Sequence, residues 1–216
     1  MNPMWGKPGI KNNEDEKKTS LTHIVGNDAG GGDRVDVQGN KIFFYSSVVE
    51  DKILDMNKGL HDICGRVMLR QSESTLGNSF YGESPIMLHI KSYGGSVFAG
   101  LAGMDTILDI KKRVPVYTIV EGCSASAGTF LSCVGSKRFM RKHAWMLIHQ
   151  LSSGFWGKYM EIKDEVDNLD RLMDTIKTVY KEHTKVPMKE IDGILKRDIW
   201  WDANTCLKYG LIDEII

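Results

Sequence analysis

Two serines, Ser124 and Ser126, lie among small residues in the stretch EGCSASAG, directly after a run typical of a buried strand. A serine hydroxyl attacks a carbonyl carbon only when a nearby base takes its proton. Ser126 stands at the predicted start of a helix, where backbone N–H groups, beginning with that of Ala127, can stabilise an oxyanion. A serine there is also an ordinary N-cap worth about 1 kcal/mol, so that interpretation stays open. Ser124 lies in the extended approach and is the weaker candidate.

Six histidines could supply the base. His149 ends the run AWMLIHQ, where a buried strand would deliver it to the carboxyl edge of a sheet, the edge at which open α/β sheets bind ligands. His89 lies inside an apolar strand and fits a packed position. Asp198, in KRDIWW, could orient an imidazole, since it has no capping role. A structural histidine and an ion pair between Asp198 and Arg197 or a lysine are the simpler alternatives.

The run SYGGS, residues 92–96, places paired glycines between a strand and a helix. Such a turn lets the backbone approach a ligand and present N–H groups to it, although it can also be only a tight turn. No Walker lysine follows it, so a phosphate cradle is not expected. The chain has no HExxH motif and no Cys/His cluster with metal spacing, so we expect neither a metal nor another cofactor.

The composition limits the classes of function. A chain of 216 residues with 42% hydrophobic residues is long enough for one sizeable soluble domain. Its 28 basic and 28 acidic residues argue against binding to nucleic acid, and no apolar run is long enough to cross a membrane. Four scattered cysteines without a CxxC pair, and a start without an apolar signal segment, predict free thiols in a reducing compartment such as the cytoplasm.

Strands that alternate with helices along the chain predict an α/β domain with a largely buried sheet. Residues 1–36 are polar and are expected to form a flexible tail or a propeptide, followed by a domain over residues 37–216. We expect strands at 41–48, 85–90, 114–122, 138–142 and 144–150, helices at 50–71, 127–134 and 160–183, and a polar loop at about 70–84. Two short helices should follow, one with Pro187 at N1 and one capped by Asp202 and closed by Gly210.

Taken in order, these motifs resemble the ClpP family, the caseinolytic serine peptidases that form the proteolytic subunit of ATP-dependent Clp protease. KSYGGSVFAG resembles the family's NSPGGSVxAG segment, and SASAGTFL resembles its AASMGAFLL nucleophile stretch. MLIHQ resembles VMIHQ, and the C-terminal stretch from HTKVP onward resembles HTGQ…RDxFxSAxEAxxYGLID. The similarity covers about residues 37–216.

The resemblance implies a ClpP/crotonase-like spiral of ββα units with a protruding handle helix, and a serine endopeptidase that acts through an acyl-enzyme. Ser126 would be the nucleophile, His149 the general base and Asp198 the orienting carboxylate. The N–H groups of Gly95 and Ala127 would form the oxyanion hole. No cofactor is implied, since ATP is used only by a partner.

The resemblance also implies a homo-oligomer of two stacked heptameric rings that enclose the catalytic chamber. The helix at 160–183, with residues 154–157 before it, would join the rings, and an AAA+ unfoldase (ClpX/ClpA/ClpC-like) would feed polypeptide substrates. The chain departs from the family at a few positions. Tyr93 replaces the proline of SPGG, and Met87 and His89 stand where the family often has aromatic docking residues.

Three other functions are alternatives to an active Clp-type endopeptidase. A catalytically silent ring subunit would commonly have lost a member of the Ser/His/Asp set, which is intact here. A viral head-maturation peptidase of similar fold is only weakly disfavoured by a chain that carries the peptidase alone. A crotonase acting on a CoA thioester shares the spiral, but it typically uses carboxylates and leaves Ser126 and His149 without a role.

Overall fold

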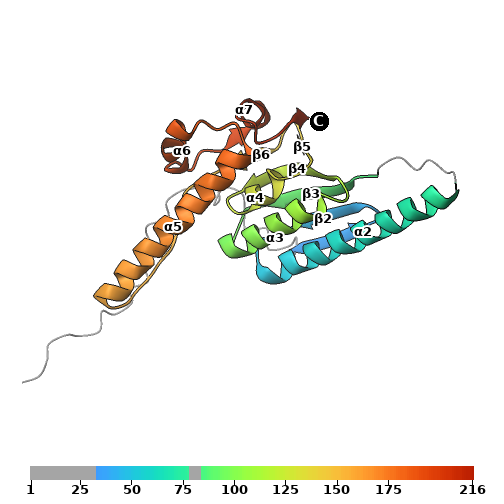
Figure 1. Ribbon diagram of the computed structural model, residues 1–216. Coiled ribbons are helices and arrows are strands. Elements are labelled where there is room, and N and C mark those ends of the chain that lie inside the picture. The colour runs from blue at the N-terminus through green and yellow to red at the C-terminus, as the bar shows by residue number, and fades with distance from the viewer. Residues whose placement is uncertain (1–32, 78–83) are drawn as a thin grey trace, which may run out of the picture. The chain divides into compact units, whose positions relative to one another are not determined.

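The computed structural model describes residues 33–77 and 84–216, and it shows an α/β domain (Figure 1). The elements follow one another as β1 (Arg34–Gln38), β2 (Lys41–Tyr45), α2 (Glu50–Gly77), β3 (Ile86–Ser92), α3 (Val97–Ile110), β4 (Val116–Ala125), α4 (Gly128–Ser132), β5 (Lys137–Met140), β6 (Trp145–Leu147), α5 (Tyr159–His183), α6 (Met188–Leu195), β7 (Trp201–Asp202), α7 (Ala203–Lys208) and β8 (Glu214–Ile215). Within the described residues the strands form one eight-stranded sheet in the order β1-β2-β3-β4-β5-β8, with β6 joined to β4 and β7 joined to β6.

Strand β4 is the centre of this arrangement, because it changes partner along its length. Its first half, Tyr117–Val120, pairs in parallel with β5, and its second half, Cys123–Ala125, pairs in parallel with β6. On the other side it pairs with β3, whose register shifts between Ile90 and Ser92. The break falls at Gly122, whose φ of 73° lies in the left-handed region that glycine adopts most readily. The change of partner turns the end of β4 toward β6 and β7.

Helices α2 and α3 cover one face of β2, β3 and β4, as Figure 1 shows. They do so because their apolar residues recur at helical spacing and the inward side chains of the strands are aliphatic or aromatic. The buried set includes Ile53, Met56, Leu60, Ile63 and Ile107 from the helices and Ile42, Phe44, Leu88 and Ile90 from the strands. Helix α3 begins where the Ser96 side chain accepts a hydrogen bond from the Ala99 N–H at 3.2 Å.

The predicted polar loop is wrong for residues 70–77, because α2 continues to Gly77. The residues at 70–75 are polar, and neither they nor Leu76 is a glycine or a proline, so nothing ends the helix before Gly77. The rest of the predicted loop, at 78–83, lies outside the described residues. Strand β4 also runs past its predicted end at residue 122, and Pro187 is the N-cap of α6 rather than its first helical residue.

Helix α5 matches its predicted range closely, and it extends away from the sheet (Figure 1). Its buried residues are Ile176, Val179 and Tyr180, all near its C-terminal end. Most of the predicted tail, residues 1–36, lies outside the described residues. Its last residues, from Arg34, belong to β1, so the sheet begins slightly before the predicted domain start at residue 37.

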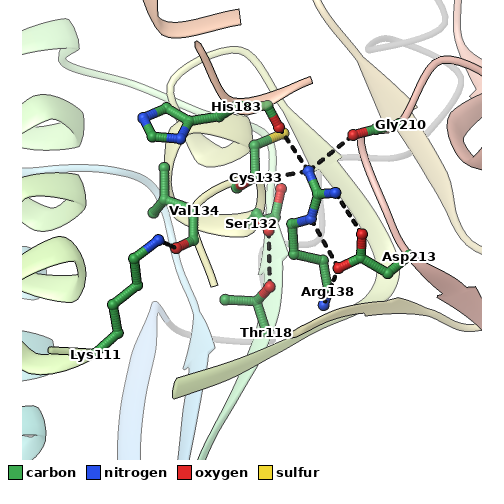
Figure 2. Close-up of polar contacts among 9 residues, drawn as sticks. All are labelled: Lys111, Thr118, Ser132, Cys133, Val134, Arg138, His183, Gly210 and Asp213. Carbon is green, nitrogen blue, oxygen red and sulfur yellow. Dashed lines mark hydrogen bonds and ion pairs between the residues drawn. The ribbon is translucent and has the colours of Figure 1, made fainter. Parts of the chain in front are cut away.

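Arg138 on β5 ties three elements together at their ends (Figure 2). Its guanidinium donates hydrogen bonds to the carbonyl of His183, the last residue of α5, at 2.6 Å, and to that of Gly210, just after α7, at 2.8 Å. Two further nitrogens donate to the Asp213 carboxylate at 3.0 and 2.5 Å. These bonds hold the pKa of Asp213 below its usual value. The contacts satisfy carbonyl groups that have no partner within their own helix.

We predict that Arg138→Met lowers the free energy of unfolding by about 3 kcal/mol, because two carbonyls lose their donor and the Asp213 carboxylate keeps only the backbone N–H of residue 138. Lys137→Met is the matched control: the adjacent Lys137 pairs with Glu214 at 3.0 Å, but both side chains are about half exposed. It should cost less than about 1 kcal/mol. Urea unfolding of the two variants measures the difference, and equal losses would contradict the role given to Arg138.

Candidate active site

Ser126 lies in the turn that joins β4 to α4, and its backbone is strained. Its φ of 53° makes it the one non-glycine residue with positive φ among residues 33–77 and 84–216. A non-glycine residue held in this region costs on the order of 1 kcal/mol and persists only where surrounding contacts fix it. Here the Ser126 N–H donates to the carbonyl of Leu147 on β6 at 2.8 Å. The Ser126 carbonyl accepts from the N–H of Thr129 at 2.9 Å and from its hydroxyl at 2.6 Å.

The Thr129 hydroxyl also contacts the Tyr180 hydroxyl of α5 at 2.7 Å, inside the core. Tyr180 is fully buried, and this burial raises the pKa of its phenol far above the usual value. The buried end of α5 is therefore linked through one threonine to the Ser126 turn.

The interpretation of Ser126 as an N-cap is wrong. Helix α4 begins at Gly128 with Ala127 as its N-cap, and no side chain caps it. The hydroxyl of Ser126 is therefore not committed to the helix, and the side chain is half-buried at the turn. Ser124, by contrast, is fully buried in β4, where its hydroxyl lies 3.4 Å from that of Ser132. Ser124 is thus part of the packing between β4 and α4.

The paired glycines of the SYGGS run lie against Ser126. A Cβ on Gly94, whose φ is 94°, would lie 2.5 Å from the Ser126 Cβ and 3.2 Å from the Ala127 nitrogen. The turn is held by Val48, whose N–H donates to the Gly94 carbonyl and whose own carbonyl accepts from the Ser96 N–H, both at 2.8 Å. Only a residue without a side chain fits at Gly94, so the turn and Ser126 are in direct contact.

Two backbone donors stay available beside Ser126. In the part of the chain that the structure describes, neither the Gly95 N–H nor the Ala127 N–H donates to another group of the protein. Gly95 is exposed and follows Gly94 directly, and Ala127 follows Ser126. The geometry therefore presents two free N–H groups on either side of the Ser126 turn, an arrangement suited to a carbonyl oxygen that gains negative charge.

His149 follows β6 by two residues instead of ending it, and its Nδ1 lies 3.4 Å from Oδ1 of Asp198. The imidazole is 23% exposed and the carboxylate 68% exposed. Among the ion pairs of the described residues, Asp198 pairs with His149 and with no arginine or lysine, so the Arg197 alternative is not supported. The Gln150 N–H donates to the Leu195 carbonyl at 2.7 Å, which holds the His149 segment beside the end of α6.

The other acidic residues near the C-terminus have structural roles, as expected. Asp202 caps α7 by accepting a hydrogen bond from the Thr205 N–H at 2.8 Å. Asp192 on α6 pairs with Lys177 of α5 at 2.9 Å, and this ion pair lowers the pKa of Asp192. The backbone thus brings Ser126, Gly95, Ala127 and His149 to one end of β3, β4 and β6, and Asp198 reaches the same end from the segment before β7.

A second polar cluster, which the sequence did not reveal, surrounds Glu121 of β4 and includes Tyr45 of β2, the buried His89 of β3, and Arg141, which follows β5. His89 stacks on Phe43 with ring centroids 4.7 Å apart, and its Nδ1 lies 3.0 Å from Oε1 of Glu121. Tyr45 donates to the same carboxylate, and Arg141 contacts it at 3.1 Å. Burial and the contact with Glu121 raise the pKa of Tyr45 to about 12. Burial opposes ionisation of Glu121, but hydrogen bonds from Tyr45, His89 and Arg141 outweigh it and lower the pKa of Glu121.

Within residues 33–77 and 84–216, no group of three His, Cys, Asp or Glu side chains has a geometry that could hold a metal ion. The cysteines at 64, 123, 133 and 206 are free and buried. None of the helices in the same part of the chain combines the length and the apolar character that crossing a membrane requires.

Comparison with known proteins identifies the family. The sequence model described as "Clp protease" matches residues 45–216. The chain belongs to the Clp protease family. It is 31% identical over 179 residues to the "ATP-dependent Clp protease proteolytic subunit" of Deinococcus radiodurans, with 80% of this chain and 83% of that protein covered. It is also similar to the solved structure of a ClpP1 mutant from Listeria monocytogenes, with a TM-score of 0.66, 26% identity, and 82% and 91% of the two chains covered.

These matches confirm the predicted family, the ClpP-like fold and the assignment of a peptidase, which is a hydrolase. The family match includes every element from α2 to β8, and so the whole set of strand ends around Ser126. The chain belongs to a family of peptidases, so peptide-bond hydrolysis is the reaction that the groups around Ser126 would have to support.

We predict that Ser126→Gly is more stable than Ser126→Ala by about 1 kcal/mol, because only glycine relieves the positive φ while both variants lose the hydroxyl. Urea unfolding of the two variants gives the difference. Ser72→Gly and Ser72→Ala, in helix α2, are the matched control pair. There the glycine variant should be the less stable of the two by about 1 kcal/mol, since helical backbone carries no such strain. Equal stability of Ser126→Gly and Ser126→Ala would show that the turn is not strained.

Proposed function

We propose that this chain is a serine endopeptidase that hydrolyses peptides and unfolded polypeptides through an acyl-enzyme. Ser126 is the nucleophile, His149 the general base, Asp198 the orienting carboxylate, and Gly95 and Ala127 supply the oxyanion hole. One observation carries the proposal. Ser126 has a strained backbone, and its side chain does not cap α4. Its N–H donates to the carbonyl of Leu147, two residues before His149, and Ser126 packs against the Gly94 turn. A strained turn from a strand to a helix is a recurring way to expose a nucleophilic serine.

The contact between His149 and Asp198 sets the direction of proton transfer. With Nδ1 protonated and facing the Asp198 carboxylate, Nε2 is left unprotonated to take the proton of Ser126. Ser126 Oγ then bonds to the substrate carbonyl carbon, and the carbonyl oxygen takes up the negative charge. Each N–H donor directed at that oxygen lowers the barrier by about 3 kcal/mol.

The tetrahedral intermediate collapses as the C–N bond breaks, and the imidazolium of His149 gives its proton to the leaving amine. This leaves an ester between Ser126 and the N-terminal part of the substrate. Water, deprotonated by the same imidazole, then attacks the ester and releases Ser126. The chemistry uses no metal and no cofactor.

The separation of 3.4 Å between His149 and Asp198 exceeds that of a good charge-assisted hydrogen bond by about 0.5 Å. Such bonds are often long in the absence of substrate and shorten in the productive complex. The exposed position of Asp198 leaves room for this small movement. Whatever holds the 196–200 segment in place therefore contributes to the geometry of the base.

We also propose that the protein works as a homo-oligomer of two stacked heptameric rings in the cytoplasm, supplied with polypeptide by an AAA+ unfoldase that alone consumes ATP. Large exposed apolar side chains support an assembly through α5 and the segment before it. They are Phe155, Trp156, Tyr159, Met160, Ile162 and Val166, with Trp156 89% exposed. The unfoldase would meet a surface altered by the Glu121 cluster, because His89 stands where the family often has an aromatic docking residue.

A catalytically silent ring subunit is the second candidate, and a head-maturation peptidase of the same fold is the third. The silent subunit forms the same rings but cleaves no peptide. The maturation peptidase cleaves, but it does not need an unfoldase. The two experiments below separate these possibilities from the proposed endopeptidase.

Ser126→Ala is predicted to abolish both cleavage of a fluorogenic peptide and labelling by a fluorophosphonate, because it removes the hydroxyl that attacks the substrate. Ser124→Ala is the matched control: its hydroxyl is buried against Ser132, so labelling at Ser126 should persist. Mass spectrometry of the labelled peptide identifies the modified residue. Labelling of Ser126→Ala at another serine would overturn the assignment, and a wild type that forms rings but neither labels nor cleaves would favour the silent subunit.

Native mass spectrometry is predicted to give a species of fourteen times the 24.3 kDa chain mass. Phe155→Ser combined with Trp156→Ser should shift it toward single rings, because these exposed aromatic side chains would lose their partners. Leu207→Ser, an exposed apolar residue on α7, is the control and should keep the full assembly. A monomeric wild type would contradict the proposed rings without affecting the assignment of Ser126.

A further inference from the structure

Tyr93 and Trp200 make an aromatic contact that joins two parts of the candidate site. Their ring centroids are 6.4 Å apart and the ring planes meet at 80°, an edge-to-face geometry. Tyr93 directly precedes the Gly94–Gly95 turn, which carries one proposed oxyanion donor. Trp200 follows Asp198 by two residues. The contact thus connects the segment of the oxyanion hole with the segment of the orienting carboxylate.

The contact crosses the sheet. Tyr93 follows β3 and Trp200 precedes β7, and β4 and β6 lie between these strands in the order of hydrogen bonding. Three strand spacings amount to about 14 Å, so only two large side chains directed toward each other can bridge them. The Tyr93 side chain also reaches Cys123 on β4, where it partly opposes the rise in the pKa of the thiol that burial causes. A proline at this position, as in the family's SPGG, could not reach Trp200.

The segment that carries Asp198 has few other anchors. Its start is held by backbone bonds, from the Lys196 N–H to the Asp192 carbonyl and from the Arg197 N–H to the Ile194 carbonyl. Pairing with β6 begins again only at Trp201. Between these points Asp198 contacts His149 and Trp200 contacts Tyr93. Trp200 is half-buried, whereas Asp198 and Ile199 are exposed.

We propose that Tyr93 is a positioning residue: its ring holds Trp200 and so fixes Asp198 against His149 while it anchors the Gly94–Gly95 turn. This inference rests on the proposed serine peptidase mechanism. A proline restricts the backbone of a turn without any contact, since its φ is fixed. A tyrosine lacks that restriction, and the edge-to-face contact with Trp200 supplies the constraint in another way. The contact between these two rings thereby positions both the Gly94–Gly95 turn and Asp198.

Steady-state hydrolysis of a fluorogenic peptide by the assembled protein tests the inference. Tyr93→Ala and Trp200→Ala should each lower kcat about threefold to tenfold, the range expected for loss of one edge-to-face pair. KM should change less than kcat, since neither ring is placed to bind the scissile bond. Tyr93→Phe keeps the ring and should restore most of the rate. Should Tyr93→Ala fail to fold, Tyr93→Leu, which keeps apolar volume without a ring edge, takes its place.

A double-mutant cycle with Asp198→Asn separates positioning from a general loss of stability. If Tyr93 acts in part through Asp198, Tyr93→Ala should lower kcat by a smaller factor in the Asp198→Asn background than in the wild type, and the remaining effect reports on the Gly94–Gly95 turn. Tyr117→Ala is the matched control, because Tyr117 makes a similar aromatic contact with Phe139 at 5.8 Å, at the far end of β4. It should lower the thermal midpoint about as much as Tyr93→Ala does, with kcat unchanged.

Three results would overturn the inference while leaving the peptidase in place: an unchanged kcat in Tyr93→Ala, an effect confined to KM, or the same fold loss in the Asp198→Asn background. A wild type without any Ser126-dependent hydrolysis would instead overturn the proposed function, and the role of Tyr93 with it. The labelling of Ser126 by a fluorophosphonate, measured on the same samples, distinguishes the two failures.

Discussion

The left-handed backbone of Ser126 is the constraint on which the rest of the site depends. A serine occupies this conformation only when its neighbours offset the strain, and here they do so from three directions. Leu147 on β6 accepts its N–H, Thr129 on α4 bonds to its carbonyl, and Gly94 approaches it too closely for any side chain. Each contact comes from an element that also carries or adjoins another proposed catalytic group. The interactions that hold the turn therefore also assemble the site.

The stability of the elements around the turn comes from two other sources. The aliphatic core between the sheet and helices α2 and α3 fixes β2, β3 and β4. The C-terminal elements contribute to the same apolar cluster and are joined in addition through Arg138, which bonds to the ends of α5 and α7 and to Asp213. Hydrogen bonds from the Arg138 guanidinium suit this place, because helix ends expose carbonyl groups that apolar packing would leave without a partner.

Much of this architecture could be predicted from the sequence. Apolar periodicity gave the strands and most of the helices, since burial of one face leaves a local signature. The Asp202 cap was predictable because a cap needs only residues three apart. Motif spacing and resemblance pointed to Ser126, His149 and Asp198 as candidates. The structure places His149 against Asp198 and bonds Ser126 to Leu147, two residues before His149. The extension of α2 was missed because polar residues are compatible with both loop and helix.

The remaining features depend on pairing between distant segments, which no local pattern records. The positive φ of Ser126 follows from the bond to Leu147, and the Glu121 cluster requires β2, β3 and β4 to be in register. The Tyr93–Trp200 contact spans more than a hundred residues of chain. In each case the residue types were visible, but their partners were set by the order of strands in the sheet. Tertiary topology, rather than propensity, decides such contacts.

The two halves of β4 pair with different strands and have different roles. Residues Tyr117–Val120 pair with β5, whereas Cys123–Ala125 pair with β6 and so set the register between the proposed nucleophile, Ser126, and the segment of its proposed base, His149. Gly122, which has a positive φ, separates these two stretches. Substitutions in the first stretch would affect the stability of the fold, and substitutions in the second would affect the geometry of the site. The ten residues of this one strand are therefore under two different constraints.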